Sequence, residues 1–207
     1  MVGTGKCFLV TGPPGVGKST LIMRVFESLK ASNPTLKVQG FYTREVRVAG
    51  ERVGFEVVTL DGRTCPLASS NFSSQESHRW PNVGKYKVDV ASFESLALLE
   101  LQVREDTDLF IIDEVGKMEL YSSSFFPAVL KVLESNIPIL ASIPVPKFGR
   151  DIPADGTNLS RDLIGRNLED QLMFEAPYLL NLQIFSLHFG SCKVKESCRS
   201  NFVYIEC

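Results

Sequence analysis

The chain has 207 residues, of which 44% are hydrophobic and 22% are charged, and its formal net charge is −2. These values are typical of a soluble globular protein with one well-packed domain and at most a small addition. The charge gives no support to nucleic acid as the main partner, and no apolar run approaches the roughly 18 residues of a membrane span.

Cysteine and histidine usage gives no support to a zinc site. The five cysteines form no Cys-x-x-Cys pair, and the only histidines, His78 and His188, are far apart in the sequence. An odd number of cysteines favours free thiols in a reducing compartment. We therefore expect the cytosol by default and leave an organelle open, because a removed transit peptide would be invisible in this numbering.

The first predicted elements are a strand, a glycine-rich loop and a helix. KCFLVTG, residues 6–12, is a short apolar run that predicts a buried parallel strand. Apolar residues at helical spacing predict a helix from Ser19 to about Ala31. Between them, TGPPGVGKST (residues 11–20) matches the Walker A pattern G-x-x-x-x-G-K-[ST] without a mismatch. The motif therefore has the strand–loop–helix context that it requires.

This loop predicts a binding site for a nucleoside triphosphate with magnesium. Its glycines allow backbone amides to approach a phosphate, and the helix N-terminus favours an anion. Lys18 is expected to contact the β- and γ-phosphates as a catalytic residue, and Ser19 to bind Mg²⁺, which prefers oxygen ligands. The alternative is a glycine turn with a surface lysine. The loop consists of Gly12, Pro13, Pro14, Gly15, Val16, Gly17, Lys18 and Ser19.

Residues 38–60 predict a β-hairpin insertion, because two β-rich runs flank a tight turn at Ala49-Gly50. Residues 66–82 are polar and rich in serine, which predicts a surface loop. Residues 84–90 predict another short strand, and Ser92 is expected to cap the helix that follows it.

A second buried strand ends in two carboxylates. In LFIIDE, residues 109–114, four apolar residues precede Asp-Glu, as in a Walker B strand. Asp113 is predicted to bind Mg²⁺, and Glu114 to orient or deprotonate an attacking water as a catalytic residue. A solvated strand end is the plain alternative, but catalytic groups gather at the carboxyl ends of parallel strands. Lys117, Arg44 and Arg47 are weaker candidates for a positive charge near the γ-phosphate.

The remaining pattern completes an α/β fold. Residues 122–134 predict a helix and residues 137–143 a strand, which gives a parallel sheet flanked by helices. After Pro146 the periodicity weakens. We divide the chain into a domain at residues 1–153 and an atypical C-terminal tail at residues 154–207.

Several segments of the chain resemble the cancer-related nucleoside-triphosphatase family of small P-loop NTPases, and their sequences are most similar to those of plant members. The resemblance rests on FLVTGPPGVGKST, GFYTREVR, RVGFEVVTLDGRTCPLA, VGKYKVDVASFESLAL, IIDEVGKMELYS and SIPVPK, in order over about residues 6–150. It implies a RecA-like fold and slow, Mg²⁺-dependent hydrolysis of ATP, GTP and other nucleoside triphosphates to the diphosphate and phosphate. It also implies two nucleotide-binding segments, Gly12 to Ser19 and Leu109, Phe110, Ile111, Ile112, Asp113, Glu114, Val115 and Gly116.

The tail departs from the family pattern, which usually continues with a helix, a strand and a short Asn-Arg motif. Loss of the usual last strand would expose one sheet edge. Two alternatives to hydrolysis therefore stay open. One is a nucleotide-binding protein with little or no turnover, and the other is a small-molecule or nucleoside kinase. A kinase would need a lid with arginines, for which residues 61–85 offer only Arg63 and Arg79.

Overall fold

The computed structural model describes residues 7–12, 14–72, 76–144, 193–196 and 202–206. No helix in these segments is long and apolar enough to cross a membrane. In chain order the elements are β1 (Cys7–Gly12), α1 (Lys18–Ser32), β2 (Val38–Val48), β3 (Glu51–Thr59), β4 (Thr64–Ser69), η1 (Glu76–Arg79), β5 (Asn82–Val83), β6 (Tyr86–Val88), α2 (Val90–Glu100), β7 (Leu109–Asp113), η2 (Glu119–Tyr121), α3 (Phe125–Glu134), β8 (Ile139–Pro144), β9 (Lys193–Glu196) and β10 (Phe202–Glu206).

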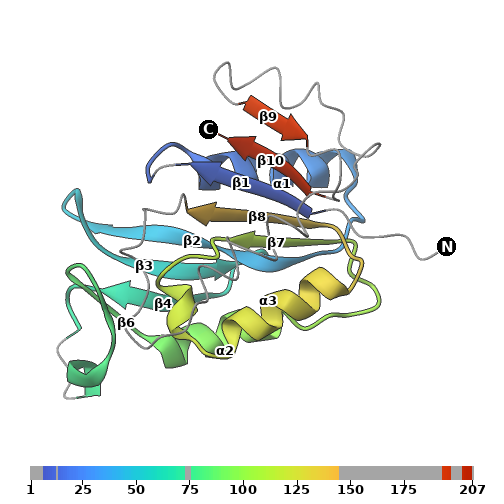
Figure 1. Ribbon diagram of the computed structural model, residues 1–207. Helices are drawn as coiled ribbons and strands as arrows, with labels where there is room; N and C mark the ends of the chain where they lie inside the picture. Colours follow the sequence, from blue (N-terminus) through green and yellow to red (C-terminus); the bar gives the residue numbers. More distant parts are fainter. Residues whose placement is uncertain (1–6, 13, 73–75, 145–192, 197–201, 207) are drawn as a thin grey trace.

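The described strands form a single sheet in the order β5-β6-β4-β3-β2-β7-β8-β1-β10-β9 (Figure 1). Its centre is parallel, from β2 through β7, β8 and β1 to β10. On the side of β2, the chain extends the sheet with antiparallel strands β3, β4, β6 and β5. The predicted parallel α/β sheet and the hairpin at 38–60 are therefore both present.

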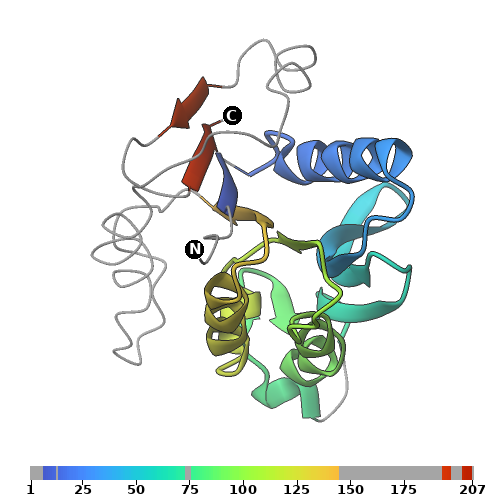
Figure 2. The same cartoon turned by 90° about the vertical axis from the view of Figure 1, so that its right-hand side faces the viewer.

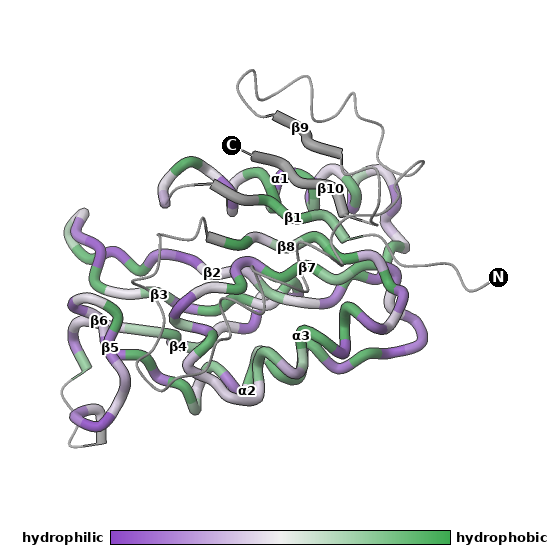
Figure 3. Tube along the Cα trace, in the orientation of Figure 1, coloured by the Kyte–Doolittle hydropathy of each residue, from purple (hydrophilic) through white to green (hydrophobic). Residues whose placement is uncertain are grey.

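Helices cover both faces of this sheet, with α1 on one face and α2 and α3 on the other (Figure 2). The alternation of side chains along β7 supplies both contacts. Leu109 and Ile111 pack in the cluster that contains Ile22 of α1, whereas Phe110 and Ile112 pack in the cluster that contains α2 and α3. A strand buried on both faces is a continuous apolar run, and Figure 3 shows hydrophobic residues along β7, β8 and β1.

Two local predictions are wrong. Residues 66–69 belong to β4 and not to a surface loop: Leu67 and Ala68 are buried, and Ala68 pairs with Phe55 of β3. Serine-rich composition hid this strand, because its apolar part is short. Ser92 is not the cap of α2. The cap is Asp89, whose carboxylate accepts a hydrogen bond from the Ser92 backbone N–H at 2.9 Å.

The edge of β1 that faces away from β8 is covered by another strand, so the loss of a last strand, which would have exposed it, does not apply to this edge. β10 pairs with β1 in parallel, from Cys7 opposite Phe202 to Thr11 opposite Glu206, and β9 pairs with β10. Apart from these two strands, the predicted tail at 154–207 lies outside the described residues. The boundary at 153 stays a prediction.

Candidate active site

Both predicted motifs end at the same edge of the sheet. Gly12 is the last residue of β1, Asp113 is the last residue of β7, and β8 lies between these two parallel strands. The glycine loop and the carboxylates therefore emerge side by side at the carboxyl ends of the strands, where parallel sheets place their ligands.

The loop leaves the N-terminus of α1 open toward an anion. Gly15 and Gly17 have φ angles of 80° and 101°, in the left-handed region that favours glycine. Gly17 is the N-cap residue, no side chain caps it, and the first turn of α1 holds no acidic residue. Amide groups at this end are therefore suited to a phosphate. Pro14 and Val16 are exposed, whereas Pro13 lies outside the described residues.

Lys18 is the residue that joins the loop to the second motif. Its side chain is 8% exposed, and its Nζ lies 3.8 Å from Glu114 Oε2. A nearly buried ammonium group beside a carboxylate, at the start of a helix, is not a surface lysine. The structure therefore brings together two residues that are 96 positions apart in the sequence, as their numbers 18 and 114 show.

Asp113 has one carboxylate oxygen that the described protein leaves without a partner. The residue is 1% exposed; its Oδ1 accepts a hydrogen bond from the Ser142 hydroxyl of β8, whereas Oδ2 is buried with no hydrogen-bond partner. Burial raises the pKa of this carboxyl, opposed by the hydroxyls of Ser142 and Ser19 and by the charge of Lys18. An unsatisfied buried oxygen is costly, and a bound cation would satisfy it.

The oxygen donors at this place fit magnesium. Asp113 supplies a carboxylate, and Ser19, exposed on the first turn of α1, supplies a hydroxyl close enough to act on the pKa of Asp113. Mg²⁺ commonly uses one or two protein oxygens together with phosphate oxygens and water. The described segments contain no cluster of three or more His, Cys, Asp or Glu residues, the arrangement that a protein-only metal cage would need.

Glu114 lies closer to solvent than Asp113. Its side chain is 34% exposed. Burial raises the pKa of its carboxyl, the charge of Lys18 acts against that rise, and the negative charge of Asp113 adds to it. A partly exposed carboxylate beside a phosphate-binding loop can reach a water molecule, and a raised pKa makes it a better proton acceptor.

Sequence reasoning missed Glu119. This carboxyl is 3% exposed, Thr43 Oγ1 of β2 donates a hydrogen bond to its Oε1 at 3.5 Å, and burial together with the charge of Glu114 raises its pKa to about 8. It stands in the segment IIDEVGKMELYS, but no pattern distinguishes a buried acid in a short helical turn from an exposed one.

The other predicted residues are placed as follows. Leu109 to Ile112 are buried strand core, and Val115 and Gly116 are buried in the following loop. The hairpin arginines are engaged on the surface, Arg44 with Glu56 at 2.9 Å and Arg47 with Glu45 at 2.6 Å. The structure therefore does not bring these arginines to Lys18.

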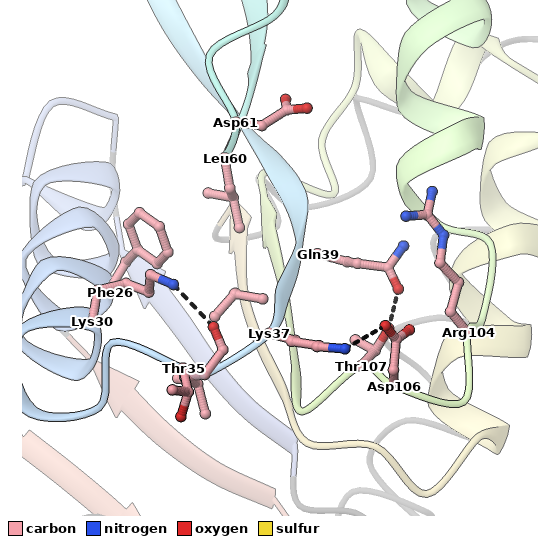
Figure 4. A pocket seen from close by; sticks show the side chains of 12 residues that line it. Phe26, Lys30, Thr35, Lys37, Gln39, Leu60, Asp61, Arg104, Asp106 and Thr107 are labelled. Atoms are coloured by element: carbon pink, nitrogen blue, oxygen red, sulfur yellow. Dashed lines mark hydrogen bonds and ion pairs between the residues drawn. The ribbon is translucent and has the colours of Figure 1, made fainter.

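A pocket of about 410 Å³ lies at the opposite edge of the sheet (Figure 4). Its lining includes Phe26 and Lys30 of α1, Lys37 and Gln39 at the start of β2, and Asp106 and Thr107 before β7. None of the predicted nucleotide-binding residues lines it. The candidate active site is therefore distinct from this pocket, because phosphates bind where the helix begins rather than where it ends.

Comparisons with known proteins identify the family of this chain. A family model described as NTPase matches residues 7–155, and the chain is 49% identical over 146 residues to the cancer-related nucleoside-triphosphatase homolog of Bos taurus, covering 67% of this chain and 75% of that one. The chain belongs to the cancer-related nucleoside-triphosphatase family. Within this NTPase family, the human protein is 46% identical over 144 residues, with the same coverage of both chains.

A further relative and two solved structures extend the match. The nucleoside-triphosphatase THEP1 of Thermofilum pendens is 44% identical over 140 residues, covering 67% of this chain and 73% of that one. The solution structure of a human cancer-related nucleoside triphosphatase superposes with a TM-score of 0.64 at 38% identity, covering 91% of this chain and all of that one. The crystal structure of THEP1 from Aquifex aeolicus gives a TM-score of 0.56 at 35% identity, over 68% and 77%.

Proposed function

We propose that this NTPase-family chain hydrolyses nucleoside triphosphates, ATP and GTP among them, to the diphosphate and phosphate with Mg²⁺. The observation that carries the proposal is the 3.8 Å approach of Lys18 Nζ to Glu114 Oε2, beside the unpartnered Oδ2 of Asp113. Relatives that share this part of the chain are named nucleoside-triphosphatases.

The glycine loop and Lys18 would hold the β- and γ-phosphates. Amides at the start of α1 provide hydrogen-bond donors, and the Lys18 ammonium group provides a compact positive charge. Because Lys18 is nearly buried, its charge is screened less than an exposed charge would be. This binding energy does not depend on the base, which agrees with more than one nucleoside triphosphate as substrate.

Asp113 and Ser19 would hold Mg²⁺. The metal, when bound, neutralises charge that develops on the phosphate oxygens. Ser142 keeps the Asp113 carboxylate in place through its hydrogen bond to Oδ1, so that Oδ2 faces the side left without a protein partner.

Glu114 would orient the attacking water and accept its proton. The proton leaves the water as its oxygen bonds to the γ-phosphorus, and the bond to the bridging oxygen of the diphosphate breaks. A carboxylate positioned next to the phosphate site contributes through orientation and proton transfer. The cation beside it, Lys18, stabilises the charged form of Glu114 before the reaction.

The test is release of phosphate from ATP and GTP without any acceptor, with Mg²⁺ or with a chelator. We expect equal amounts of diphosphate and phosphate with Mg²⁺, and loss of release with the chelator. Binding of the Mg–triphosphate in the same preparation is measured by calorimetry. Tight binding without release, or release that requires a second substrate, would overturn the proposal.

A further inference from the structure

Glu119 is a buried acid that the proposed reaction does not yet use. It begins η2, six residues after Asp113, and its side chain is 3% exposed, whereas that of Glu114 is 34% exposed. Thr43 of the neighbouring strand β2 donates a hydrogen bond to its Oε1 at 3.5 Å. Glu119 therefore lies on the protein side of Glu114, away from solvent.

The carboxyl groups of Glu114 and Glu119 border the same small space at Gly116. A Cβ atom on residue 116 would lie 2.6 Å from Glu114 Oε1 and 3.0 Å from Glu119 Oε2. Glycine is the residue that leaves room for both groups. The backbone here is held by bonds from Leu120 N–H to the Gly116 carbonyl at 3.0 Å and from Val115 N–H to the Ser142 carbonyl at 2.9 Å.

The charges around Glu119 favour its neutral form. The negative charges of Glu114 and Asp113 raise the pKa of Glu119, whereas backbone hydrogen bonds at Glu119 itself and at Gly116 lower it. On α2, which also packs against η2, Glu94 is occupied by a hydrogen bond from Ser122 at 2.5 Å. Lys18 contacts Glu114 instead. Two carboxyl groups that border the same small space do not both ionise without a cost, so the more buried one, Glu119, keeps its proton.

We propose that Glu119 is a positioning residue for Glu114: an uncharged carboxyl group that supports Glu114 beside Gly116 and leaves it the charged member of the pair in front of Lys18. The inference rests on the proposed hydrolase function. Its physical basis is the shared space at Gly116, the burial of Glu119 and the placement of the cation on the Glu114 side.

The role follows from what the reaction requires of Glu114. To accept a proton from water, Glu114 must be unprotonated and must point toward the phosphate site. A neutral Glu119 meets both requirements, because it adds no repulsion. Once Glu119 ionises, its negative charge repels the Glu114 carboxylate from its place beside Gly116. Because the pKa of Glu119 is raised to about 8, phosphate release should fall as the pH rises through that value.

The test compares the pH profiles of wild type, Glu119→Gln and Glu100→Gln. Glutamine keeps the size of Glu119 and cannot ionise. Glu100 is a matched control, since it is 7% exposed but pairs with Arg63 at 2.5 Å, away from the site. We expect Glu119→Gln to keep wild-type kcat near pH 7 within a factor of about 3, with KM unchanged, and to lose the alkaline fall near pH 8. Glu100→Gln should keep that fall.

If phosphate release falls equally above pH 8 in wild type and in Glu119→Gln, the inference is overturned. A large loss of kcat in Glu119→Gln at every pH, with a native melting temperature, would also overturn it.

A stability measurement separates this failure from failure of the hydrolase proposal. Because the folded pKa of Glu119 is raised above its unfolded value near 4.3, the stability of wild type relative to Glu119→Gln is lost as the pH rises toward about 8. If wild type releases no phosphate, the hydrolase proposal and the role of Glu119 in it fail together. The melting temperatures then still show whether Glu119 keeps its proton.

Discussion

Carboxyl groups at the two edges of the sheet differ in burial and in partners. At the edge that holds the pocket, Asp106 pairs with Lys37 at 2.8 Å on the surface, and this bond lowers the pKa of Asp106. At the edge of the glycine loop, burial raises the pKa of Asp113, Glu114 and Glu119, and Asp113 Oδ2 has no hydrogen-bond partner among the residues that the structure describes. The surface pair already has its hydrogen bond. The acids at the glycine loop lower the free energy of unfolding, and binding of a cation would raise it again.

The substitution with the largest expected effect, Glu114→Gln, tests whether an acid at the glycine loop takes part in the hydrolysis. Glu114→Gln removes the proton acceptor and keeps its size, so we expect kcat for phosphate release to fall by about 10²–10⁴-fold. Binding of the Mg–triphosphate should stay near the wild-type level, because the loop and Lys18 are unchanged. Steady-state kinetics and calorimetry measure the two quantities. Equal losses of binding and turnover would assign Glu114 to phosphate binding instead.

Lys18→Ala tests the cation that meets these acids. It removes the charge 3.8 Å from Glu114, and we expect phosphate release to fall by about 10²–10³-fold. In contrast to Glu114→Gln, the affinity for the triphosphate should also fall, which calorimetry would detect. A variant with wild-type affinity would show that the loop amides bind the phosphates without this lysine.

Gly116→Ala tests the close approach of the two glutamates. The new Cβ would lie 2.6 Å from Glu114 Oε1, so the carboxylate must move, and a displacement of about 1 Å can cost about 100-fold in rate. We expect a loss of up to that size in kcat, with a destabilisation of about 1–3 kcal/mol in urea unfolding. Wild-type kinetics in this variant would show that the position of Glu114 is not constrained by Gly116.

Asp113→Asn separates function from stability at the same site. Burial raises the folded pKa of Asp113. The free energy of unfolding is therefore higher at low pH, where Asp113 is protonated, and falls as the pH rises and Asp113 ionises. At pH 7 the uncharged asparagine avoids this loss, so we expect the nucleotide-free variant to be more stable by about 1 kcal/mol while phosphate release is abolished. Urea unfolding at pH 7 and near pH 4 checks the sign, because the gain should shrink at the lower pH.

The smallest effect is expected at the amino ends of the parallel strands, where the pocket lies. Lys37→Ala breaks the exposed pair with Asp106, and such pairs often contribute nothing measurable to stability. Phosphate release and melting temperature should both match those of wild type. A clear loss of activity in this variant would mean that the two edges are coupled.

Residues with a strong local pattern were predictable from the sequence. The glycine loop followed by Lys18 and Ser19, and the apolar run that ends in Asp113 and Glu114, were predicted to lie at the carboxyl ends of parallel strands and do so, because strand direction and helix polarity follow from chain order in a parallel sheet. The roles assigned to these residues, and the cytosolic location, stay predictions.

Features that depend on tertiary contacts were not predictable. Ser142, which holds Asp113, and Thr43, which contacts Glu119, are ordinary strand residues whose partners come from other strands. The burial of Glu119 follows from the packing of η2 against α2 and α3 rather than from its neighbours in sequence. Pairing of β10 with β1 was missed for the same reason, since no local pattern records a partner so distant along the chain.

That last pairing has a consequence for synthesis of the protein. β1, which leads into the glycine loop, lies between β8 and β10, and its partner residues in β10 are 202–206. During translation β1 is made first, but one of its edges has no partner until β10 leaves the ribosome. A strand edge in this state can pair with other chains. The nascent chain therefore completes the sheet around β1 late, and conditions that slow synthesis would prolong the exposure of this strand edge.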